Sequence, residues 1–182
     1  TISSSIANSP QLFTHNSSNI KNMNLKPIFY TFEEWSFQLQ TFLQSFILVF
    51  FVFLFFKFSL LSNFLLYSWL PLLNLFIFIY WFPLIICLIS VRFSDIAQLV
   101  PIILQLVFLT SPILYRKESL GELAWITKIN FIYKILDSLR IAILEGYINY
   151  QDSVLILIFN LIGLIMTIKH LESEAKRLPF LL

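Results

Sequence analysis

The chain has 182 residues, of which 58% are hydrophobic and 12% are charged, and its formal net charge is +2. A soluble domain carries about 25% charged residues, so this chain has too few charges to cover a water-facing surface. The small net charge, with no basic run and no nucleic-acid motif, argues against a nucleic-acid partner. The single cysteine, Cys87, cannot form an internal disulfide, and we expect it to be a small apolar packing residue.

The charged residues flank long apolar stretches instead of being spread along the chain. Residues 58–91 contain no acid or base, and neither do residues 97–115. An uncharged stretch of about 20 residues is long enough for a helix to cross the hydrocarbon core of a bilayer. The sequence therefore predicts an all-α integral membrane protein, organised as a single transmembrane domain over residues 1–182.

The first segment, residues 1–36, is polar and rich in serine and asparagine. It begins with Thr1 and not with methionine, and we expect the chain to be a fragment with residues missing upstream. Pro27 is expected to break any helix in this segment. Residues 21–30 are therefore predicted to form a loop or a short surface helix.

The first predicted span covers residues 37–57. Trp35 and Lys57 lie at its ends, where such residues often anchor a helix at the membrane surface. Its middle is an uninterrupted run of Phe, Val, Leu and Ile, which is typical of a helix that is apolar on every side. Glycine is scarce, with three residues in all, so close small-residue packing is not expected to join the spans.

The apolar stretch that follows is too long for one crossing. A helix over residues 58–91 would exceed the hydrocarbon core, which is about 30 Å thick. Polar residues between Ser59 and Asn63 predict a turn, so the second span is placed at residues 67–90. We expect Pro83, inside this span, to kink the helix.

The third predicted span, residues 96–115, follows a short charged motif over residues 91–96. Asp95, followed by Gln98, fits an N-cap and the start of a helix. Pro112 predicts a break near the end of this span.

Residues 116–151 are predicted to form an amphipathic helix or helix pair that lies on the membrane or enters it partway. Apolar residues recur there at helical spacing, and the charged residues fall off that stripe. The fourth span is placed at residues 152–168, and a charged tail follows over residues 169–182. Four spans place both ends of the chain on one side of the membrane.

The positive-inside rule does not by itself say which side that is, because the basic residues divide evenly between the two sides. One side holds Lys21, Lys26, Arg92, Lys169, Lys176 and Arg177. The other side holds Lys57, Arg116, Lys117, Lys128, Lys134 and Arg140. If the amphipathic segment is partly embedded, its bases count for less and the two ends of the chain are cytoplasmic.

Three pieces of sequence together resemble a known family. They are Val91-Arg92-Phe93-Ser94-Asp95-Ile96, Leu99-Val100-Pro101-Ile102-Ile103-Leu104-Gln105-Leu106 and Phe108-Leu109-Thr110-Ser111-Pro112-Ile113-Leu114-Tyr115. They are similar to the permease subunits of type 2 ABC exporters, and within these to the group that moves O-antigen, capsule or teichoic acid. Ser94, where that family usually has a second base, and Asn130-Phe131, in place of Asn-Pro, depart from the pattern.

The resemblance implies that this chain holds spans three to six of a six-span permease in the bacterial plasma (inner) membrane. Its cargo would be a lipid-linked polysaccharide, as in lipopolysaccharide export. Residues 1–36, 91–96 and 169–182 would be cytoplasmic, and residues 116–151 would form an outer, re-entrant gate segment.

The implied partners are membrane lipid, a second permease copy that completes a homodimer, and an ABC ATPase subunit. That subunit would bind ATP–Mg, so no cofactor and no hydrolysis are expected in this chain. The sequence agrees, since it shows no Walker A loop, metal-ligand cluster or nucleophile elbow.

Four groups of candidate site residues follow from this hypothesis. Arg92 and Asp95 would form the substrate entrance, where Arg92 attracts the pyrophosphate of the lipid-linked glycan. The segment that contacts the ATPase would contain Asn19, Lys21 and Lys26. The aromatic residues of the translocation path would be Trp69, Tyr80, Trp81 and Tyr115. The residues of the outer gate would be Lys134, Asp137 and Arg140.

Each group also has a plainer interpretation. Arg92 can be an anchor at the membrane surface and Asp95 a helix cap, and the two can pair with each other if the turn between them is helical. The remaining groups can be a loop, lipid-facing bulk and solvated charges. Two other functions stay open, namely the export of a small lipid or drug and a non-transporting scaffold subunit.

Overall fold

The computed structural model describes residues 1–22, 25–111 and 130–182. Every regular element in these ranges is a helix, which confirms the all-α class. Within the same ranges, three helices are long and apolar enough to cross a membrane. They are α4 (Pro27–Phe56), α6 (Trp69–Arg92) and α10 (Tyr150–Glu174).

The other described helices are shorter. They are α1 (Ile2–Asn8), the 3-10 turn η1 (Ser9–Gln11), α2 (Leu12–His15), α3 (Ser17–Asn22), α5 (Phe58–Tyr67), α7 (Ile96–Thr110), α9 (Phe131–Glu145) and α11 (Leu178–Leu181). With 15 described residues, α7 is too short to count among the candidate spans. The end of the predicted span 96–115, including Pro112, lies outside the described residues, so four spans stay a prediction.

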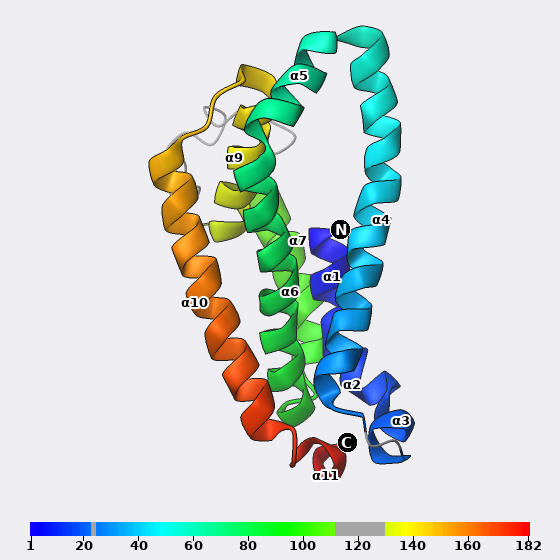
Figure 1. Cartoon of the computed structure of the whole chain (residues 1–182). Helices are drawn as coiled ribbons and strands as arrows, with labels where there is room; N and C mark the ends of the chain where they lie inside the picture. The colour runs from blue at the N-terminus through cyan, green and yellow to red at the C-terminus, as the bar shows by residue number, and fades with distance from the viewer. Residues whose placement is uncertain (23–24, 112–129) are drawn as a thin grey trace.

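The long helices run along one axis of the molecule (Figure 1). Helix α4 rises from the lower end of the view, α5 reverses the chain near the upper end, and α6 returns to the lower end. Helix α7 then rises, and α10 descends to the lower end, where the C-terminus lies near α2 and α3 (Figure 1). Residues 91–96 and the charged tail therefore share one end of the bundle with the end of the N-terminal segment.

No described helix runs through Pro27, but this proline begins the long helix α4, so the predicted loop or short surface helix over residues 21–30 is wrong from Pro27 onward. Proline suits the first turn of a helix, where its missing N–H would have had no helical partner. It also favours extended backbone in the residue before it, and Lys26 has φ −65° and ψ 139°. The helix consequently starts well before the predicted span at residues 37–57.

Helix α4 ends just before Lys57, and α5 begins directly after this residue, so the break lies before the polar residues that predicted a turn. Lys57 leaves the helical region with φ −153° and ψ 89°, whereas Ser59 and Asn63 lie inside α5. The amide of Asn63 donates a hydrogen bond to the carbonyl of Ile143, at 3.1 Å. The polar group that predicted a turn therefore ties α5 to α9 instead.

The polar N-terminal segment forms α1, η1, α2 and α3 and contributes to the core. Ile6 and Phe13 are 2% and 0% exposed. An apolar cluster at the lower end, here called the lower cluster, joins α2, α3, α4, α6, α10 and α11. It consists of Phe13, Ile20, Tyr30, Tyr80, Leu84, Cys87, Leu88, Leu171 and Leu178. Cys87 is a buried packing residue, as predicted.

Candidate functional site

The last turn of α6 places Arg92 at the lower end of the bundle. Its guanidinium donates a hydrogen bond to Oε1 of Glu174, at 2.7 Å. Glu174 is the last residue of α10, so this ion pair joins the ends of two long helices. A second guanidinium, that of Arg177, lies 3.8 Å from the same oxygen. We call these residues the Arg92–Glu174–Arg177 cluster.

Within this cluster the acidic side chain is buried and the two basic side chains are exposed to solvent. The side chain of Glu174 is 9% exposed, whereas those of Arg92 and Arg177 are 46% and 73% exposed. Oε2 of Glu174 is buried and has no hydrogen-bond partner among the described residues. The carboxylate is thus held by cations through one oxygen only, and both arginines remain approachable from outside.

Asp95 occupies the N-cap position of α7, as predicted, but its side chain makes no capping hydrogen bond. Its backbone carbonyl accepts hydrogen bonds from the N–H groups of Gln98 and Leu99, at 3.1 and 3.2 Å. Within the described part of the chain, Arg92 pairs with Glu174 and not with Asp95. The turn between Arg92 and Asp95 is not helical, since Phe93 has φ −128° and ψ 91°.

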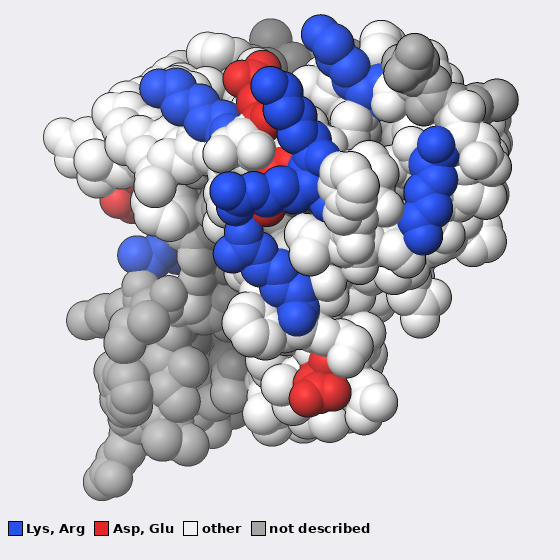
Figure 2. Space-filling view, turned by 90° about the horizontal axis from the view of Figure 1, so that it is seen from below, with Lys and Arg blue, Asp and Glu red and all other residues white. Residues whose placement is uncertain are grey.

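The residues predicted to contact an ATPase lie at the same end. Asn19 and Lys21 are exposed on α3, and Lys26 is exposed at the start of α4. Between them, Ile20 is 6% exposed and packs into the lower cluster. Figure 2 views this end and shows Lys and Arg side chains crowded around acidic ones. Helix α3 is thus held to the bundle by Ile20, while Asn19 and Lys21 point outward and are available to a partner at this end.

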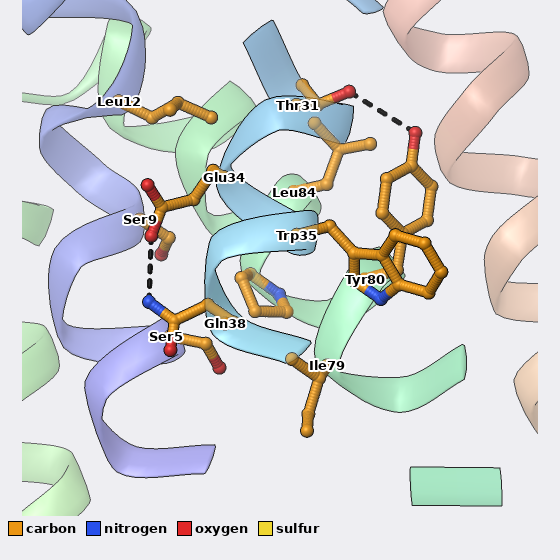
Figure 3. Close-up of a pocket in the computed structure, with 11 residues that line it drawn as sticks. Ser5, Ser9, Leu12, Thr31, Glu34, Trp35, Gln38, Ile79, Tyr80 and Leu84 are labelled. Carbon is orange, nitrogen blue, oxygen red and sulfur yellow. Dashed lines mark hydrogen bonds between the residues drawn. The ribbon is translucent and has the colours of Figure 1, made fainter. Parts of the chain in front are cut away.

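A small cavity lies between α1, α4 and α6 (Figure 3). Its volume is about 20 Å³, which is room for about one water molecule. The side-chain amide of Gln38 donates to the carboxylate of Glu34 at 2.8 Å, and the Ser4 hydroxyl donates to Oε1 of Gln38 at 3.1 Å. At another edge, the hydroxyls of Tyr80 and Thr31 are 3.2 Å apart. The cavity is too small for a sugar. The bond from Ser4 to Gln38 joins α1 to α4, and the Thr31–Tyr80 contact joins α4 to α6.

A row of buried polar groups, here called the polar ladder, joins α6 to α10. The indole N–H of Trp81 donates to Oδ1 of Asn160 at 3.0 Å, and Asn160 donates to the carbonyl of Asn74 at 3.1 Å. Asn74 in turn donates to the carbonyl of Ser153 at 2.9 Å. A Cβ at Gly163 would lie 2.8 Å from the Trp81 ring. The expectation that close small-residue contacts play no part between the spans is therefore wrong at this glycine.

The aromatic residues predicted for a translocation path do not converge in the structure. Trp81 faces α10 through the polar ladder, whereas Tyr80 faces α4 and stacks on Phe32 with ring centroids 5.1 Å apart. Trp69 begins α6 and is 57% exposed. Tyr115 lies outside the described residues. A role of these side chains in a path stays a prediction.

Two of the predicted gate residues lie on one cavity and the third does not. Lys134 and Asp137 line a cavity of about 440 Å³ between α9 and the start of α10, together with Asn149 and Asp152. Asn149 caps α10, accepting from the N–H of Asp152 at 3.3 Å and donating to its carboxylate at 2.6 Å. Arg140 is exposed and lies outside this lining.

The sequence reasoning missed three residues that the structure places at helix contacts. Asn74 and Asn160 lie inside apolar spans, where an unpaired amide is unfavourable. Their positions could therefore have predicted hydrogen bonds to another helix. Glu174 gave no comparable signal, because it lies in a charged tail among exposed neighbours. Among the described residues there is no group of three or more side chains that could hold a metal ion.

A comparison with known protein families adds one finding. Residues 23–144 match the family model described as ABC-2 type transporter. The match covers more than half of the chain and runs from just before α4 almost to the end of α9. No curated protein matches the chain.

Proposed function

Because this chain belongs to the ABC-2 type transporter family, we propose that it is the permease of an exporter for a lipid-linked polysaccharide. Family membership and the apolar helices make it a multi-pass membrane component of an ABC transporter, with a transport role and not a catalytic one. Such permeases normally work with an ABC ATPase. Our proposal adds a homodimer in the bacterial plasma membrane, cytoplasmic ends, and cargo of the O-antigen, capsule or teichoic acid type.

The position of Arg92 is the observation that carries this proposal. Its side chain is 46% exposed on the last turn of a helix that is long and apolar enough to cross the membrane. A polyprenyl-linked glycan carries its phosphate groups where its apolar tail meets water, which is the depth at which such a helix ends. Arginine binds phosphate through paired N–H groups and keeps its charge there.

The basic residues around Arg92 strengthen the case for an anionic cargo. Lys21 on α3 and Lys26 at the start of α4 are exposed at the same end of the bundle. Clustered charges of one sign raise the local concentration of an oppositely charged ligand. Asn19 and Lys21 also give α3 the exposed polar surface that we propose for the contact with the ATPase, which would bind ATP–Mg.

The proposal is tested with the full chain and its ATPase in lipid nanodiscs, with ATP hydrolysis as the readout. Addition of a polyprenyl-pyrophosphate-linked glycan should stimulate hydrolysis by the wild type. Arg92→Gln should weaken the response to the glycan. Asn19→Ala, at the exposed and uncharged residue of the proposed ATPase contact, should reduce stimulation without changing glycan binding. Lys57→Gln, which removes a base from the other end of α4, serves as the control and should leave both unchanged.

Three outcomes would redirect this proposal. Stimulation by a small lipid or drug, without any response to the glycan, would favour the rival cargo. Failure of any ABC ATPase to copurify with the chain would favour a scaffold subunit. An unchanged glycan response in Arg92→Gln would show that Arg92 is not part of the substrate entrance.

A further inference from the structure

The guanidinium that we assign to the cargo phosphate is already engaged by the chain's own carboxylate. Arg92 donates to Oε1 of Glu174 at 2.7 Å, a distance typical of a charge-assisted hydrogen bond. Carboxylates and phosphates both present a pair of oxygens that arginine can bind through two N–H groups. Glu174 therefore occupies the position on Arg92 that a phosphate oxygen would take.

The carboxylate of Glu174 has only part of its hydrogen-bonding capacity satisfied at this position. Its Oε2 is buried without a hydrogen-bond partner among the described residues, and Arg177 approaches Oε1 only to 3.8 Å. The arginines are open to the outside, at 46% and 73% exposure of their side chains, and the carboxylate lies behind them at 9%. An anion arriving from outside would meet both cations before the carboxylate.

We propose that Glu174 is an internal competitor, which the phosphate group of a lipid displaces from Arg92 and Arg177. This inference rests on the proposed function, because it takes Arg92 to be the residue that meets the cargo phosphate. The exchange is non-covalent, since one ion pair breaks and another forms. A phosphate carries more acceptor oxygens than the carboxylate and can engage both guanidinium groups together.

The exchange would also affect helix packing, because the Arg92–Glu174 ion pair joins the end of α10 to the end of α6. Leu171 and Leu178 flank Glu174 along the chain, and each is 1% exposed. Both pack in the lower cluster that also contains Ile20 of α3. Release of Glu174 from Arg92 would therefore loosen the apolar contacts that seat α3, the segment proposed to meet the ATPase.

The test measures binding of a polyprenyl phosphate to the full chain and its ATPase in nanodiscs of neutral phosphatidylcholine. Glu174→Gln removes the competing charge, while its amide oxygen can still accept a hydrogen bond from Arg92. We expect this variant to bind the probe about two- to fivefold more tightly than the wild type, the scale of a partly exposed ion pair. Glu174→Asp keeps the charge on a shorter arm and should give a smaller gain if Glu174→Gln folds poorly.

Glu172→Gln is the matched control, because Glu172 is an exposed acid near the same end of α10. It removes the same charge and should leave probe binding unchanged. Equal binding by Glu174→Gln and Glu172→Gln, together with weaker binding by Arg92→Gln, would overturn the competition while leaving the entrance at Arg92 intact. Wild-type binding by Arg92→Gln would overturn both.

A second arm separates the two sources of a lipid phosphate. Phosphatidylcholine headgroups also contain phosphate, but their choline cancels its charge, whereas nanodiscs that contain phosphatidylglycerol offer phosphate headgroups with a net negative charge to the cluster. If those headgroups are the ligand, they should abolish the gain of Glu174→Gln for the polyprenyl phosphate. If the cargo is the ligand, the gain should persist in these nanodiscs. Either result supports displacement of Glu174, and a gain that is missing in both membranes overturns it.

Discussion

Helices α6 and α10 meet through hydrogen bonds and a close glycine contact, whereas α4 meets its neighbours mainly through aromatic rings. In the most apolar window of each helix, the buried share of residues is 56% for α6 and 6% for α4. Apolar side chains alone give helices little reason to associate in lipid, because lipid tails solvate them equally well. Polar groups that need partners, and small residues that permit close approach, hold helices together there.

The contacts of α4 are concentrated in its lower part. The indole of Trp35 donates to the carbonyl of Phe76 at 3.1 Å, and the rings of Phe42 and Phe76 are 5.4 Å apart. Higher on α4, Leu48 and Phe55 are 71% and 83% exposed. Helices α6 and α10 therefore form the fixed unit of the described bundle, and α4 is attached to that unit near one end.

The largest expected effect comes from filling the space at Gly163. In Gly163→Leu, the new side chain would clash with the Trp81 ring, because even a Cβ would lie 2.8 Å from it. We expect a loss of about 3 kcal/mol or more in the free energy of unfolding, measured by denaturant titration in nanodiscs or detergent. The neighbouring Ile162→Leu is the control, since Ile162 is 52% exposed. Equal stability of the two variants would mean that α6 and α10 are not in close contact.

A smaller effect is expected from breaking the polar ladder at its centre. Asn160→Leu removes the acceptor of the Trp81 indole N–H and the donor to the Asn74 carbonyl. Hydrogen bonds between membrane helices contribute about 0.6–1.7 kcal/mol each, so we expect a loss of about 1–2 kcal/mol in the same assay. Combining it with Trp81→Phe should cost less than the sum of the single changes. Strict additivity would argue against the Trp81–Asn160 bond.

The smallest effects should be found on α4. Trp35→Phe removes the hydrogen bond to the Phe76 carbonyl and part of the ring that lies edge-on to Phe32 and Tyr80, and it should cost about 1 kcal/mol. Leu48→Ala, on the exposed upper part of the same helix, should change stability by less than about 0.5 kcal/mol. If Leu48→Ala proved the more harmful of the two, α4 would be held along its length and the contrast with α6 would fail.

The helical class could be predicted from the sequence because lipid imposes it. A backbone inside hydrocarbon must satisfy its own hydrogen bonds, so the charge-free residues of α6 had to be helical. Local rules failed where a residue had two uses. Pro27 can break a helix or begin one, and Asn63 can mark a turn or bond to another helix, and only the packing of the chain decides between them.

The candidate site was less predictable because its residues are distant in sequence. Arg92 stood out as a base at the end of an apolar stretch, but its partner Glu174 is 82 positions away. Nothing in the local pattern distinguishes Glu174 from the neighbouring Glu172. The link between Trp81 and Asn160 spans 79 positions and depends in addition on Gly163. Pairings of this kind are set by which helices lie together.

The burial of Cys87 makes this chain a convenient background for chemical mapping. It is the one thiol of the sequence and is 0% exposed within the lower cluster. Maleimide reagents should therefore leave the folded wild type unmodified, without removal of the native cysteine. A thiol introduced at the exposed Ser94 would then report, by labelling intact cells against opened ones, which side of the membrane the charged turn faces.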